Sequence, residues 1–180
     1  MSQIESLDCN LKPDNTHALE SLDLSDSSET IKKIKITFPK EYVYTEYVLD
    51  EKEAQMSEFF KVLLSETIPD SDGYIRCELE TISNDTFKYI YTYMKHYNGK
   101  PQEIVHKPLR SSNFEECVND IWDYNFVKNF KIVDLIFISN ACNYLNIQCL
   151  MHLCLSFVAC KIRGKTEDEV REIFKMPENM

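Results

Sequence analysis

Glycine, positive charge and long uninterrupted apolar runs are all scarce in this chain of 180 residues. Its three glycines lie far apart, at Gly73, Gly99 and Gly164, so the chain cannot form a Gly-rich loop that cradles a phosphate group. The 20 Lys and Arg against 30 Asp and Glu give a net charge of −10, which disfavours binding to a phosphate backbone. We therefore expect no phosphate cradle and no nucleic-acid partner.

The sequence also lacks an apolar segment of membrane length. Residues 132–162 carry only Asp134 and Lys161 as charged side chains, yet polar residues interrupt every window of the roughly 20 residues that cross a bilayer. The cleanest apolar stretch, 149–160, would extend about 18 Å as a helix, against a hydrocarbon core of about 30 Å. The N-terminus shows no basic segment followed by an apolar one. We expect neither a secretory signal nor a membrane partner.

Seven cysteines, an odd number, favour thiols in a reducing compartment over a set of disulfides. Cys149, His152 and Cys154 come closest to a metal cluster, but Cys154 points away from the face that the other two share, and no fourth ligand is near. A cysteine nucleophile would need His96 or His106 as its base, and no motif links either histidine to a thiol. We expect core cysteines, with no metal, no cofactor and no catalytic site.

The first 30 residues differ in composition from the rest. They hold seven acidic side chains, one basic side chain and no aromatic residue. Such a segment cannot bury enough apolar surface to offset its ordering entropy, so 1–30 is predicted to be a disordered acidic tail.

Residues 31–128 are predicted to form an α/β core. Alternating apolar residues predict strands at 34–38 and 75–79, and Tyr, Val and Thr predict another at 42–49. A D-x-x-E capping box at Asp50 predicts a helix that continues to Leu64. A second helix is expected from Asn84 to the Asn98-Gly99 pair, followed by a long polar surface loop over 98–120.

The remaining segment, 129–180, is predicted to be helical. Two helices, 132–145 and 147–163, are expected to be broken near Asn146, and the second is apolar almost all round. A helix of that kind is a central buried one or has a partner on its second face. A T-x-x-E capping box at Thr166 opens a short last helix. The pattern leaves a partner groove and plain core packing equally open.

Two segments of this region resemble the signature of the S-phase-kinase-associated (SKP) adaptor family of SCF ubiquitin ligases. They are N-Y-L-N-I at 143–147 and V-A-x-x-I-R-G-K-T-x-D-E-V-R-x-x-F at 158–174. Trp122-Asp123 followed by Phe126 is similar to a further family segment, and the element order of 34–97 agrees with the family's BTB/POZ-like fold. The resemblance spans about 31–176 and implies a small three-stranded sheet flanked by helices, with a C-terminal helical extension.

The resemblance also implies a function. Such proteins are not enzymes. They bridge a cullin scaffold and F-box substrate receptors in ubiquitin-dependent protein degradation, so the expected location is the cytoplasm and nucleus. Carried over by position, Asn143 and Tyr144 would face the cullin. The F-box face would comprise Leu150, Val158, Ile162, Lys165, Thr166, Val170 and Phe174.

Two departures from the family pattern keep alternatives open. Glu167 stands where the family usually has Pro. The family also continues past the Phe with another acidic helix, whereas the sequence ends at Met180, so the extension is expected to be shorter than the family norm. The alternative is another BTB-like interaction module, resembling elongin C or a homodimerising BTB domain. An enzyme that uses one of the thiols is a third possibility.

Overall fold

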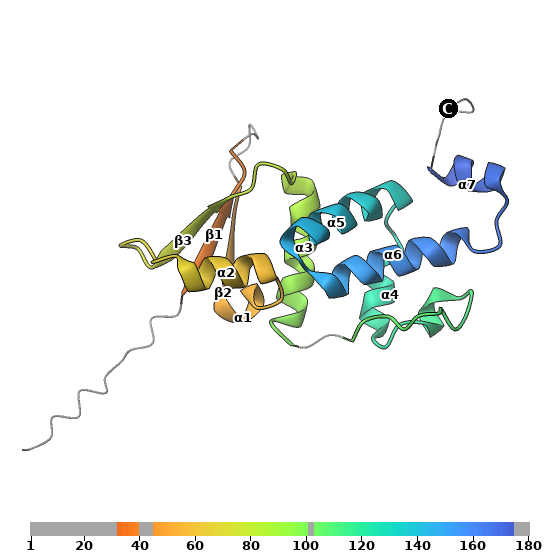
Figure 1. The fold of residues 1–180 in the computed structure, drawn as a ribbon, viewed down its shortest axis with the longest axis horizontal. Helices are drawn as coiled ribbons and strands as arrows, with labels where there is room; N and C mark the ends of the chain where they lie inside the picture. The colour runs from red at the N-terminus through yellow and green to blue at the C-terminus, as the bar shows by residue number, and fades with distance from the viewer. Residues whose placement is uncertain (1–31, 40–44, 101–102, 175–180) are drawn as a thin grey trace, which may run out of the picture.

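The sheet lies at one end of the molecule and most of the helices lie at the other, with a long helix between them (Figure 1). The structure, a computed structural model, describes residues 32–39, 45–100 and 103–174. The predicted tail, 1–30, lies outside these residues. The sheet consists of β1 (Lys33–Thr37), β2 (Glu46–Asp50) and β3 (Tyr74–Glu78), in the order β2-β1-β3. The α/β class and the three-stranded sheet flanked by helices are as predicted.

The register of the sheet follows the alternation in the sequence. Ile34 on the central strand pairs with Leu49 of antiparallel β2 and with Ile75 of parallel β3. All three side chains are buried, because residues directly opposite one another share one face of the sheet. That face therefore forms one wall of the core.

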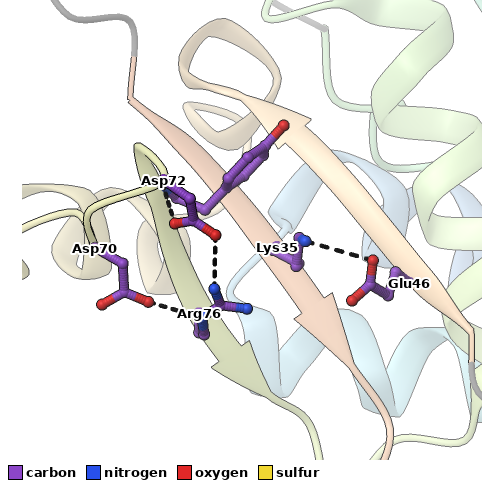
Figure 2. Close-up of polar contacts among 6 residues, drawn as sticks. Lys35, Glu46, Asp70, Asp72 and Arg76 are labelled. Atoms are coloured by element: carbon purple, nitrogen blue, oxygen red, sulfur yellow. Dashed lines mark hydrogen bonds and ion pairs between the residues drawn. The ribbon is translucent and has the colours of Figure 1, made fainter.

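The opposite face of the sheet is polar, as Figure 2 shows. Lys35 lies 3.5 Å from Glu46 on the neighbouring strand. Arg76 bonds to Asp70 at 2.7 Å and to Asp72 at 2.6 Å. The charged side chains of this face are therefore matched by neighbours in the sheet and in the turn before β3.

The helix predicted from Asp50 to Leu64 is in fact two helices. The first, α1 (Glu51–Ala54), ends after one turn, and α2 (Glu58–Glu66) starts anew. The break falls at Ser57, whose extended backbone (φ −122°, ψ 123°) and side chain cap α2. The capping box of Asp50 and Glu53 is present as predicted.

The long helix beside the sheet is α3 (Asn84–Tyr97). Its N-cap is Ser83, one residue earlier than predicted, and Asn98 ends it in the left-handed conformation as expected (φ 47°). The next residue, Gly99, has φ +75° and leaves no room for a side chain, since a Cβ would lie 2.3 Å from the Lys52 carbonyl oxygen.

The carboxyl-terminal helices are α5 (Ile132–Leu145), α6 (Gln148–Ile162) and α7 (Glu167–Phe174). The predicted break near Asn146 is confirmed, because this residue adopts the left-handed conformation (φ 52°). Figure 1 shows α5 and α6 side by side. The last residues of α5 lie near α2, and the first residues of α5 lie near α7. No helix in the described part of the chain is long and apolar enough to cross a membrane.

The segment predicted as a surface loop, 98–120, is partly buried. It contains a 3-10 turn, η1 (Phe114–Glu116), and leads into α4 (Ile121–Val127), a helix that the sequence analysis did not predict. The Phe114 ring meets Phe157 of α6 edge-on at 5.2 Å, and the Cys160 thiol donates to the Ser112 carbonyl at 3.0 Å. Packing against α6 overrides the polar composition of this segment.

Candidate functional site

The last turn of α5 carries an exposed aromatic side chain. The helix ends at Leu145, and the Tyr144 ring just before it is 50% exposed. This ring lies 5.6 Å from the ring of Phe59, in the first turn of α2. Asn143, the other residue predicted to face a cullin, is exposed beside it. The two predicted residues therefore lie together at the surface, where a partner could reach them.

Hollows flank the Tyr144 ring on both sides. One lies between α5 and the start of α3 and is lined by Phe137, Asn140, Ile82 and Thr86, among others. The second lies against α2, between Phe59, Val62 and Leu63. We call the apolar residues around these hollows the Tyr144 surface: Phe59, Val62, Phe137 and Tyr144. Large exposed apolar side chains gathered around a hollow mark an interaction site.

Sequence reasoning missed three of these residues. Phe59, Val62 and Phe137 are not among the site residues predicted from the sequence. Val62 is 50% exposed and Phe137 is 59% exposed. The available signal was the excess of apolar residues in α2, which holds five within nine positions (EFFKVLLSE), more than one buried stripe requires.

The predicted F-box residues on α6 divide into two groups. Leu150 is fully buried and Val158 is 6% exposed, so both side chains pack inside the chain's own core. Ile162, by contrast, is half-buried. It shares a helical stripe with half-buried Met151 and with Leu155, which is 41% exposed. An accessible face on α6 therefore contains Ile162 but neither Leu150 nor Val158.

The last helix continues this accessible region. Val170, Ile173 and Phe174 are half-buried, and α7 has no fully buried residue. Lys165 and Thr166 are exposed in the turn before it. We call the accessible apolar residues of the two helices the α6–α7 surface: Met151, Leu155, Ile162, Val170, Ile173 and Phe174. All predicted F-box residues other than Leu150 and Val158 lie on this surface or in the adjoining turn.

Three buried thiols, those of Cys77, Cys142 and Cys154, suit packing rather than nucleophilic attack. Burial raises the pKa of Cys77 to about 11 and that of Cys154 to about 12, and it also raises the pKa of Cys142. A nucleophilic cysteine needs a lowered pKa, because the thiolate is the reactive form. Within the described ranges, no three His, Cys, Asp or Glu side chains gather as a metal site would require.

The fold and the two surfaces define an α/β protein-interaction domain of the BTB/POZ-like class with a C-terminal helical extension. A sequence profile described as the Skp1 family dimerisation domain matches residues 148–180. The chain is 34% identical over 130 residues to the S-phase kinase-associated protein 1 homolog of Tetrahymena thermophila, covering 72% of this chain and 75% of the relative. The chain belongs to the Skp1 family.

Two plant relatives agree with this assignment. SKP1-like protein 18 of Arabidopsis thaliana is 32% identical over 98 residues, which is 54% of this chain and 59% of the relative. SKP1-like protein 14 of the same plant is 42% identical over 85 residues, covering 46% of this chain and 57% of the relative.

Proposed function

We propose that the protein is a non-catalytic adaptor subunit of an SCF-type ubiquitin ligase, which bridges a cullin scaffold and F-box substrate receptors in protein degradation. Membership of the Skp1 family supports this role. The structural observation that carries it is a pair of separate accessible apolar surfaces, the Tyr144 surface and the α6–α7 surface, an arrangement suited to holding two different partners at once. Helix α7 lies near the first residues of α5, away from the carboxyl end of that helix (Figure 1).

In this proposal the Tyr144 surface binds the cullin. A half-exposed tyrosine between two hollows is a typical interface anchor, because it buries a large apolar ring at low entropic cost and keeps a hydroxyl for a hydrogen bond. Asn143 beside it adds a donor and an acceptor. Contact between the Phe59 and Tyr144 rings favours one arrangement of this anchor before a partner arrives.

The α6–α7 surface binds the F-box in the same proposal. Ile162, Val170 and Phe174 would supply apolar contacts. Lys165 and Thr166 would set the direction of α7, since the turn they form leads directly into that helix. Leu150 and Val158 would act from inside, by holding α6 against the core.

The adaptor would contribute to ubiquitin transfer through position alone. Helices α5 and α6 pack along one another and share a buried core, so the Tyr144 surface and the α6 part of the α6–α7 surface are held at a fixed spacing. A receptor fixed to one surface would be held at a set distance from the cullin on the other, which raises the effective concentration of substrate near the charged ubiquitin carrier.

Reconstitution with purified partners tests the proposal. The full chain, the N-terminal domain of a cullin and an F-box protein should coelute as a ternary complex, and the cullin and F-box protein should not associate without the chain. Failure to bind either partner overturns the proposal. A stable self-dimer without cullin affinity, seen by light scattering, would instead support the homodimerising alternative.

A single substitution tests the cullin surface. Tyr144→Ala should weaken cullin binding by about 1–3 kcal/mol, as truncation of an interface anchor does. F-box binding and thermal stability should change little, because the ring is half exposed. Tyr89→Ala is a matched control, since Tyr89 is 38% exposed but lies on α3 against Phe130. Equal effects of the two substitutions on cullin binding would show that Tyr144 is misassigned.

A further inference from the structure

One of the last carbonyl groups of α5 accepts its hydrogen bond from a side chain of a distant segment. A helix leaves its final four carbonyls without intrahelical partners. The Cys142 carbonyl accepts from the Ile147 amide at 2.8 Å, and the Asn143 carbonyl accepts from the Asn146 amide at 3.2 Å. The Leu145 carbonyl instead accepts a hydrogen bond from a different helical segment, the Ser57 hydroxyl, at 2.6 Å.

Ser57 joins the start of α2 to the end of α5. Its side chain is fully buried. The same oxygen that donates to Leu145 accepts from the Phe60 amide at 3.2 Å, and so caps α2. One hydroxyl thus fixes the first turn of α2 and ties it to the last residue of α5.

Two rings of the Tyr144 surface, half-exposed Tyr144 and half-buried Phe59, lie next to this hydrogen bond. Tyr144 directly precedes Leu145, and Phe59 is two residues after Ser57. Because each ring is one or two residues from a bonded group, the Ser57–Leu145 bond constrains the backbone that carries both rings and with it their 5.6 Å contact. The hollow lined by Phe59, Val62 and Tyr144 spans the same junction of α2 and α5.

We infer that Ser57 is a positioning residue for the Tyr144 surface, which sets the spacing of Phe59 and Tyr144 for the cullin without touching it. This inference rests on the proposed function. Loss of the hydroxyl would leave a buried carbonyl without a donor and α2 without its cap, and the junction would relax by shifting the two helix ends apart. The α6–α7 surface, built on other elements, would keep its shape.

The test compares binding to two partners in the full chain. Ser57→Ala should raise the Kd for a cullin N-terminal domain about tenfold, because binding would have to restore the spacing that the lost hydrogen bond held, at a cost of about the size of that bond. The Kd for an F-box protein should stay within about twofold of the wild-type value. Ser139→Ala is the matched control, since Ser139 is also a buried serine but its hydroxyl donates to Ile136 within α5, at 2.9 Å. This control should leave both Kd values unchanged.

A spectroscopic measurement separates positioning from general stability. In the chain labelled at tyrosine rings, the Tyr144 signals should shift with Ser57→Ala and stay in place with Ser139→Ala, because the Phe59 ring would move relative to Tyr144. If Ser57→Ala fails to fold, Ser57→Cys is used in its place, since the thiol has a similar size and is a weak donor.

The outcomes are distinguishable from one another. Wild-type protein without cullin affinity overturns the proposed function and this inference with it. If the wild-type protein binds the cullin and folded Ser57→Ala binds it with the same affinity, the positioning role of Ser57 is overturned and the proposed function stands. An equal loss of affinity for both partners, or unfolding of both Ser57 variants, shows that the serine serves overall stability and also overturns it.

Discussion

The two last helices, α6 and α7, are neighbours in sequence that owe their stability to opposite causes. In α6, seven residues are buried, yet Ile147 at its N-cap makes no side-chain capping bond. In α7 no residue is fully buried, yet its first turn has a reciprocal capping box. The Thr166 amide donates to the Glu169 carboxylate at 2.8 Å, and the Glu169 amide donates to the Thr166 hydroxyl at 3.4 Å.

The contrast separates a helix stabilised mainly by burial from one in which local capping and ion-pair contacts contribute a larger share. Because α6 depends on burial, its inward side chains carry the energy of the fold. Because α7 depends on its capping box and on the Arg171–Glu167 pair at 2.7 Å, its apolar side can remain accessible. A helix of the second kind is suited to present an apolar face to a partner.

The largest expected effect follows from truncation of a buried ring in α6. Phe157, 2% exposed, packs against Phe114 of the 98–120 segment. Phe157→Ala should lower the free energy of unfolding by about 3–5 kcal/mol, measured by denaturant titration. Leu155→Ala, on the exposed side of the same helix, should change it by no more than about 0.5 kcal/mol. Similar losses would contradict the assignment of separate inner and outer faces.

The reverse pattern is expected in α7. Ile173→Asp should weaken F-box binding by about 2 kcal/mol, measured by calorimetry, because it introduces a charge into an apolar contact. The free energy of unfolding should fall by less than about 1 kcal/mol, since Ile173 is not buried. Glu172→Ala, at an exposed neighbour, is the control. Unfolding on the scale of Phe157→Ala would mean that α7 is part of the core.

Alkaline pH should act on α6 through a buried thiol. Burial raises the pKa of Cys154 from 9.0 to about 12, so between these values the unfolded chain has lost this proton and the folded chain still holds it. The free energy of unfolding should therefore decrease as pH rises above 9, and Cys154 alone should contribute at most about 1.4 kcal/mol per pH unit. Cys154→Ala should make the slope less steep by up to that amount in denaturant titrations at pH 8 to 10.5. An unchanged slope would show that other groups cause it.

The smallest effect concerns the cap of α7. Thr166→Ala should lower the local stability of that helix by about 1 kcal/mol, because it removes one half of the capping box. Amide hydrogen exchange should accelerate across 167–174 and remain unchanged in α6. Thr92→Ala, which removes a hydroxyl that bonds within α3, should leave exchange in α7 as it is. Faster exchange in both helices would contradict the separation between them.

The elements with local signals were predictable. The end of α5 at Asn146 and the start of α7 at Thr166 follow from backbone preferences and capping patterns that act over a few residues. The strand register follows from alternation. The break at Ser57 and the helix α4 were not predicted, because the first depends on a contact with Leu145, 88 residues away, and the second is a short helix that packs on the distant α6.

The candidate surfaces were predictable only in part. The motif placed Asn143, Tyr144 and the last two helices, and the apolar excess of α6 indicated that more than one face was in use. Leu150 and Val158, which the resemblance assigns to the F-box face, lie in the core, so their part in F-box binding stays a prediction. The residues that complete the Tyr144 surface come from α2 (Phe59 and Val62) and from an earlier turn of α5 (Phe137).

Short stretches of sequence determine the local structure of this chain, because that structure arises from interactions between near neighbours. Strand alternation, helix caps and the left-handed asparagines are examples. The choice of which apolar residues face inward and which remain at the surface depends on contacts between distant segments. Leu150 and Tyr144 are both apolar and only six residues apart. Packing buries the first completely and leaves the second half exposed, because the surrounding helices close over one and end beside the other.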